Sequence, residues 1–149
     1  MLTAQVIIDH FHMKPLTEEG GYFVETYRSP LSTAIYYLLT ADTFSAMHRL
    51  PGDEIFHFYL GDPVEMLELT KNGNGQVIIL GNTSLTMHPQ TIVPGGTWQG
   101  SHLIAGGKFA LLGTTMAPPF VFSEFESGKR RELLEEYPAF ADLITMLTF

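Results

Sequence analysis

Residues 44–61 have the sequence FSAMHRLPGDEIFHFYLG, and this stretch decides the fold. Two runs rich in aromatic residues flank Pro51 and Gly52, which are turn-forming residues. This pattern predicts two strands joined by a tight connection. The first strand carries His48 near its end, and the second begins at Glu54. The sequence therefore brings a histidine and a carboxylate onto neighbouring strands.

Strand alternation sorts the side chains of this stretch into two faces. If His48 and Glu54 both point into the interior, the residues two and four positions away point inward with them. We therefore expect four more side chains on the inner face: Phe44, Ala46, Phe56 and Phe58. His57 then faces away, as a structural or interface residue.

The same strand signal extends through most of the chain. Short runs rich in aromatic and β-branched residues recur about every ten residues, without helical segments between them. They cover residues 22–28, 33–39, 43–49, 54–60, 64–69, 76–80 and 108–114. Residues 72–75, Asn-Gly-Asn-Gly, are the best hairpin signal, because Asn and Gly tolerate positive φ. The pattern predicts an all-β fold, an antiparallel sandwich or barrel.

Both ends of the chain are predicted to be helical. Thr3 is a candidate helix cap, and apolar residues then recur at helical spacing until Pro15. Near the other end, residues 129–147 show a helical pattern that Pro138 interrupts. We expect short N- and C-terminal helices on one β domain that spans residues 1–149.

Composition excludes several classes of protein. Acidic residues outnumber basic ones 16 to 8, and a net charge of −8 disfavours binding to nucleic acid. The chain has no cysteine, which excludes disulfides, thiolate metal sites and cysteine nucleophiles. No apolar run approaches the 18 residues of a membrane span. The N-terminus lacks a basic segment, and Asp9 interrupts any signal-peptide core, so we expect a cytoplasmic protein.

Two motifs resemble those of the cupin superfamily. His48, Glu54 and Gly61 fit the first cupin motif, His-x-His, three or four residues, Glu, six residues, Gly, with Leu50 replacing the second histidine. Residues 94–99, Pro-Gly-Gly-Thr-Trp-Gln, resemble the second motif, with Gln99 at the histidine position. The resemblance implies a cupin double-stranded β-helix, or jelly-roll, barrel in which both motifs face one cavity.

The chain is still more similar to one branch, the DUF985 or Cupin_5 family. The resemblance is carried by residues 20–23, 27–29, 32–39, 48–51, 56–63, 93–100 and 112–117. Members of this family are often described as epimerase-like, because they resemble the deoxysugar 3,5-epimerase branch of cupins, which works without a metal. Cupins also commonly pair through barrel edges, so we expect a homodimer.

The resemblance also bears on cofactors. Metal-binding cupins offer three histidines and one glutamate to a divalent ion, and this chain retains only His48 and Glu54. Leu50 has no lone pair to donate, and the amide oxygen of Gln99 is a poorer ligand than imidazole. We therefore expect no bound transition metal and no other cofactor.

Two functions follow from these residues. The first is a metal-independent isomerase or epimerase acting on a carbohydrate or nucleotide-sugar, with His48 as general base and Glu54 orienting it. Gln99 would bind the substrate between Phe44, Phe56 and Phe58. The second is a non-catalytic protein that binds a sugar-like small molecule in the same pocket. A third interpretation is structural: His48 and Glu54 satisfy each other inside an inert barrel.

Other polar and aromatic residues are assigned to packing, to the rim of the cavity or to the surface. Trp98 precedes Gln99 and is expected to face away from it, into packing. Glu25 and Arg28 either reach the rim of the cavity or form a surface ion pair. The tyrosines are expected to pack, although one hydroxyl in the cavity mouth would suit a general acid: Tyr22, Tyr27, Tyr36 and Tyr37.

Overall fold

Two antiparallel sheets form the body of the molecule. A computed structural model describes residues 1–149, and strands make up 43% of the chain against 18% for helices. The first sheet has the order β1-β2-β3-β10-β5-β8, with β1 at Lys14–Pro15, β2 at Tyr22–Arg28, β3 at Thr33–Thr40, β5 at Glu54–Gly61, β8 at Gln90–Val93 and β10 at Phe109–Met116. The second has the order β11-β4-β9-β6-β7, with β4 at Phe44–Arg49, β6 at Val64–Leu69, β7 at Gly75–Leu80, β9 at Trp98–Leu103 and β11 at Glu126–Ser127.

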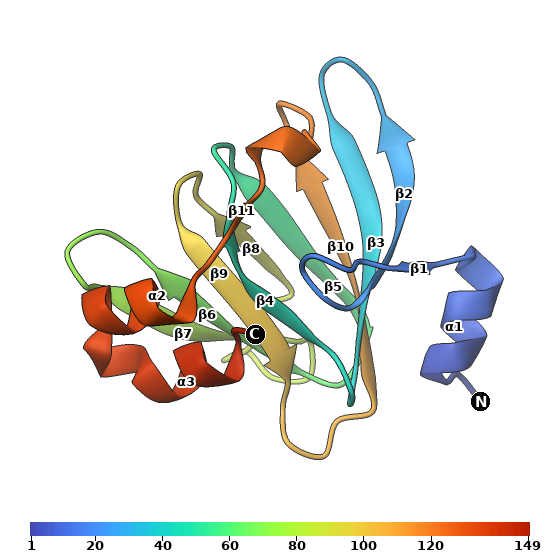
Figure 1. Ribbon diagram of the computed structural model, residues 1–149. Helices are drawn as coiled ribbons and strands as arrows, with labels where there is room; N and C mark the ends of the chain where they lie inside the picture. The colour runs from blue at the N-terminus through green and yellow to red at the C-terminus, as the bar shows by residue number, and fades with distance from the viewer.

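The two sheets face each other across an apolar core (Figure 1). Each strand contributes every second residue, as the pleat requires. Both sheets supply fully buried members, including Leu39 and Leu112 from the first and Val64 and Met66 from the second. Phe56 and Phe58 belong to this core as well. The all-β double-stranded β-helix barrel predicted from the sequence is confirmed.

Helices cover the outer faces of both sheets, as Figure 1 shows. Helix α1 (Ala4–Phe11) begins where Thr3 Oγ1 accepts a hydrogen bond from Val6 N at 3.2 Å, and it packs through Ile7 on the first sheet. Helices α2 (Arg130–Glu136) and α3 (Ala141–Met146) flank a short 3₁₀ turn that starts at Pro138. They bury a second apolar cluster against β4, β6 and β9. None of the helices has the length and apolar character that crossing a membrane requires.

A β-bulge in β4 changes which of its side chains point inward. The register of β4 against β9 shifts between Ser45 and His48. The extra residue lets Ser45 and His48 both point into the barrel, while Met47 packs outward under the C-terminal helices. Phe44 also lies on the outside, with its ring 5.2 Å from that of Phe149. The prediction that Phe44 lines the interior is wrong, because alternation cannot be counted across a bulge.

The loop between β1 and β2 crosses from the first sheet to the second. Ala46 N donates a hydrogen bond to the carbonyl of Glu19 at 2.7 Å, and the Tyr37 hydroxyl donates to the carbonyl of Gly20. Gly20 has a φ of +107°, and a Cβ there would clash with the carbonyl oxygen of Phe44. Only glycine fits this close approach. The loop is therefore fixed against β4, and it carries the Glu19 side chain to the end of the barrel.

Candidate functional site

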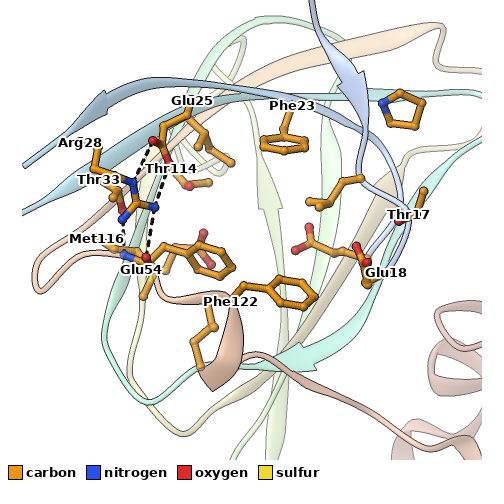
Figure 2. Close-up of a pocket in the computed structure, with 16 residues that line it drawn as sticks. Thr17, Glu18, Phe23, Glu25, Arg28, Thr33, Glu54, Thr114, Met116 and Phe122 are labelled. Carbon is orange, nitrogen blue, oxygen red and sulfur yellow. Dashed lines mark hydrogen bonds and ion pairs between the residues drawn. The ribbon is translucent and has the colours of Figure 1, made fainter.

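A cavity of about 470 Å³ opens at the end of the barrel beneath this loop (Figure 2). Its walls come from β1 and the β1–β2 loop, from β2, β3, β5 and β10, from the β4–β5 connection, and from the segment that follows β10. The apolar lining includes Phe23, Ile35, Leu50, Met116, Phe120 and Phe122. Four glutamates and one arginine add charge: Glu18, Glu19, Glu25, Glu54 and Arg28. An apolar hollow with a few convergent polar groups is typical of a small-molecule site.

Glu54 lies at the inner wall of the cavity, at the start of β5. Its side chain is buried, and its Oε1 accepts a hydrogen bond from Gln99 Nε2 at 2.9 Å. Burial raises the pKa of the Glu54 carboxyl above its ordinary value of 4.5, and the nearby charge of Glu19 raises it further. His48, Gln99 and Thr114 act against this shift. Because desolvation dominates, Glu54 holds its proton to a higher pH than a free glutamate.

Glu19 is the second carboxylate of the cavity. Its Oε2 accepts a hydrogen bond from Ser45 Oγ at 2.8 Å, and its Oε1 lies 3.4 Å from His48 Nε2. Both partners come from the bulged strand β4. The loop carboxylate is thereby fixed by a hydroxyl and an imidazole behind it. Nothing in the periodicity of residues 16–21 marks Glu19, since its position depends on a loop crossing between sheets.

His48 lies behind Glu19 and does not line the cavity. Its Nδ1 is 2.7 Å from the carbonyl oxygen of Ala46, and its ring stacks on Phe125 with centroids 5.2 Å apart. Because a carbonyl oxygen only accepts, Nδ1 carries a hydrogen, and Nε2 is the nitrogen left for a second partner. The carboxylate that Nε2 faces is Glu19. The expectation that Glu54 orients His48 is therefore wrong: Glu54 bonds to Gln99, and Glu19 faces the imidazole.

A polar row crosses the second sheet at the same end of the barrel. His48, Gln99, Glu68 and Gln76 are successive register partners on β4, β9, β6 and β7, so all four share the inward face. Glu68 is 3% exposed; its Oε2 accepts a hydrogen bond from Gln76 at 2.8 Å, and its Oε1 has no partner. The strand pattern of the sequence did not single out Glu68, although it falls two residues after the inward Met66.

The remaining predicted residues divide between core and rim. Phe56 and Phe58 point inward as expected, but they fill the core and do not line the cavity. Trp98 faces away from Gln99, as predicted, and stacks under the Arg49 guanidinium at 4.3 Å. His57 also faces away, hydrogen-bonded to Thr115 at 3.2 Å.

Glu25 and Arg28 satisfy both alternatives at once, because they form an ion pair and line the cavity. Arg28 donates from Nε and Nη2 to the two carboxylate oxygens of Glu25, each at 2.9 Å. Nη2 also donates to the carbonyl of Phe120 at 3.2 Å. Figure 2 shows these contacts as dashed lines on one side of the cavity, with Glu18 on the opposite side.

The donor set does not fit the metal centre of a metal-binding cupin. Leu50 has no donor atom, Gln99 turns its amide nitrogen toward Glu54, and His48 has committed Nδ1 to a carbonyl. No group of three or more His, Asp or Glu side chains is arranged to hold an ion.

Comparisons with known proteins agree with this architecture. A protein of Shewanella oneidensis of known structure is 28% identical, with a TM-score of 0.93, and the match covers 100% of this chain and 99% of that one. A hypothetical protein from Leishmania major is 26% identical, with a TM-score of 0.92 and 99% coverage of both chains. Oxalate decarboxylase from Bacillus subtilis shares the fold at 12% identity and a TM-score of 0.63, over 94% of this chain and 37% of that one.

No curated protein matches the chain. The model of the family Cupin_5, described as "Cupin superfamily (DUF985)", matches residues 5–128. This match spans both strand motifs, the loop that carries Glu19 and all five charged residues of the cavity. The chain therefore belongs to the Cupin_5 (DUF985) family of the cupin superfamily.

Proposed function

We propose that the protein is a metal-independent isomerase or epimerase that moves a proton on a small carbohydrate-like carbonyl compound. The observation that carries this proposal is the pair of carboxylates, Glu19 and Glu54, in one largely apolar cavity. They come from different elements and have different partners. Two acid–base groups in distinct environments are what a proton transfer with two participants requires.

The two carboxylates have complementary roles. Burial raises the pKa of Glu54 and so favours its protonated form, and in this reaction that form donates its proton to the carbonyl oxygen. Glu19 accepts the proton from the adjacent carbon, whose C–H electron pair becomes the double bond of an enediol. Glu19 then returns its proton to the enediol while Glu54 takes back a hydroxyl proton. Return to the neighbouring carbon completes an isomerisation, and return to the other face of the same carbon, once the enediol has turned in the cavity, completes an epimerisation. Both carboxyls end in their starting states, so no other reactant is needed.

His48 and Gln99 act in this proposal as positioning residues. When Nε2 of His48 also carries a hydrogen, the imidazole stabilises the Glu19 carboxylate from behind, and the Nδ1–H bond to Ala46 fixes the ring. Gln99 holds Glu54 by its Oε1. The reaction needs no metal, in keeping with a donor set that offers no three-residue cluster for an ion.

Deuterium exchange tests the proposal across a panel of candidate substrates. The protein is incubated in D₂O with aldoses, ketoses, deoxysugars and nucleotide-sugars, and NMR follows loss of the C–H signal beside the carbonyl. We expect exchange on at least one compound, and its loss in Glu19→Gln and in Glu54→Gln.

The chain offers a matched control for the carboxylate–histidine pair. Glu65 accepts a hydrogen bond from His102 Nε2 at 2.8 Å, but this pair lies on the outer face of the second sheet. The Glu65→Gln variant should therefore catalyse deuterium exchange on the substrate as fast as the wild type does. Exchange that persists unchanged in both cavity variants would contradict the assigned roles.

A second candidate is a binding protein without catalysis. It is favoured by the predominance of apolar side chains in the cavity wall and by the position of His48 outside that wall. The test is a compound that raises the melting temperature of the wild type but not that of Glu54→Gln. If this compound never exchanges hydrogen with D₂O, the result supports binding without catalysis.

A further inference from the structure

The charges of the cavity are strongly one-sided. Four glutamates line it, of which Glu54 acts in its protonated form in the proposed reaction, and the only basic side chain among the lining residues is Arg28. Neither a lysine nor a histidine belongs to the wall. The chain as a whole carries a net charge of −8, so its field has the same sign as the cavity.

Arg28 already has hydrogen-bond partners within the protein. Two of its three guanidinium nitrogens bond to Glu25, and one of these also bonds to the carbonyl of Phe120. Such a bidentate pair matches the arrangement that arginine forms with a carboxylate or phosphate ligand. Glu25 thus occupies the place that an anionic ligand would need, and the pair adds no net charge.

Aromatic rings line the same hollow as the carboxylates. Figure 2 shows Phe23 and Phe122 on opposite sides of the cavity. The negative face of a phenyl ring attracts cations, and the attraction strengthens when the cation is desolvated. Rings and carboxylates together favour a ligand that presents an ammonium group, and both disfavour a phosphate.

We propose that this cavity selects neutral or amine-bearing small molecules and rejects anionic ones, phosphorylated sugars and nucleotide-sugars included. This selectivity rests on the cavity of the proposed function, but not on the proton transfer. It narrows the substrate class from carbohydrates in general to uncharged sugars and amino sugars. Glu18 and Glu25 are the specificity residues, because they line the cavity and take no part in the proton transfer.

Two matched sets of ligands test the proposal. Glucosamine, glucose and glucose 6-phosphate form one set, and cyclohexylamine, cyclohexanol and cyclohexyl phosphate form the other. Dissociation constants are measured by NMR titration at pH 7 and low ionic strength. We expect each amine to bind about tenfold or more tightly than its alcohol, and each phosphate about tenfold or more weakly. Added salt should narrow both differences.

Two variants locate the effect. Glu18→Gln should reduce the preference for amines, and Glu25→Gln should free Arg28 and strengthen phosphate binding by about tenfold. Glu65→Gln, on the outer face, should change neither ratio. A phosphate that binds the wild type as tightly as its matched amine, or the failure of both amines to bind, would overturn the proposal.

The outcome is independent of the proposed reaction. Amine preference without deuterium exchange would leave the charge selectivity standing and refute the isomerase. Deuterium exchange on a phosphorylated sugar that binds at least as tightly as its neutral counterpart would support the isomerase and refute the charge selectivity.

Discussion

Replacement of Glu54 by glutamine should stabilise the protein at neutral pH. The amide keeps an oxygen where Gln99 Nε2 donates its 2.9 Å hydrogen bond, so this contact survives the substitution. What disappears is a carboxyl group whose pKa is raised by burial and by the charge of Glu19. A glutamate that is costly to ionise in the folded state lowers the stability of that state at every pH where the unfolded chain is ionised.

The sign and size follow from proton linkage. Above the ordinary value of 4.5 the unfolded chain loses the Glu54 proton while the folded protein still holds it. The folded state then binds more protons, so wild-type stability falls relative to the variant as pH rises. The limiting slope is about 1.4 kcal/mol per pH unit, and it continues up to the raised pKa. Above that pKa the difference is constant, at about 1.4 kcal/mol per unit of the shift.

Urea unfolding of both proteins between pH 4 and pH 9 measures this difference directly. The two free energies of unfolding should approach each other at pH 4 and separate above it, with the variant more stable. Glu25→Gln serves as control, because Glu25 is 38% exposed and ion-paired, and its removal should give no such widening gap. A Glu54→Gln protein that is less stable at pH 7, or a difference that does not vary with pH, would refute the reasoning.

Four further predictions concern the same end of the barrel and the assembly. Gln99→Met removes the donor to Glu54 and should lower the free energy of unfolding by about 1–3 kcal/mol, most of all above the pKa of Glu54, as urea titrations at two pH values will show. Gly20→Ala places a methyl group against the Phe44 carbonyl, so it should displace the loop and lower stability by more than about 1 kcal/mol; an unchanged melting temperature would contradict this close approach. Elemental analysis of protein purified without chelator should find well below one equivalent of zinc, nickel, manganese or iron, and stoichiometric metal that is lost in His48→Ala would overturn the metal-independent proposal. Light scattering at micromolar concentration should give the mass of a dimer rather than the 16.6 kDa of one chain.

The sequence was sufficient for the fold but only partly for the site. Strand runs with aromatic and β-branched residues were located correctly, because their patterning records burial on one face. Strand β9 was recognised only through its motif, since Gln99, Gly100 and Ser101 have little strand propensity. Its pairing with β4 and β6 supplies what its composition does not.

The polar partners were harder to predict than the polar residues. His48, Glu54 and Gln99 all lie inside the barrel, but their pairing depends on which side chains meet across the interior. Glu19 comes from a loop whose path is set by the close approach of Gly20 to β4, a three-dimensional fact without a sequence period. The bulge of β4 likewise moved Phe44 outside, because one extra residue reverses the alternation beyond it.

The polar row on β4, β9, β6 and β7 divides the barrel along its axis into an ionisable end and a hydrocarbon end. Val64, Met66 and Leu112 at the second end carry the cohesion of the two sheets, while the groups that would meet a ligand lie at the first. Substitutions at well-separated positions add nearly independently in free energy. Variants of this protein can therefore change their chemistry through substitutions in the β1–β2 loop and the polar row. The apolar residues at the other end keep such variants folded. Such a scaffold is a good starting point for directed evolution.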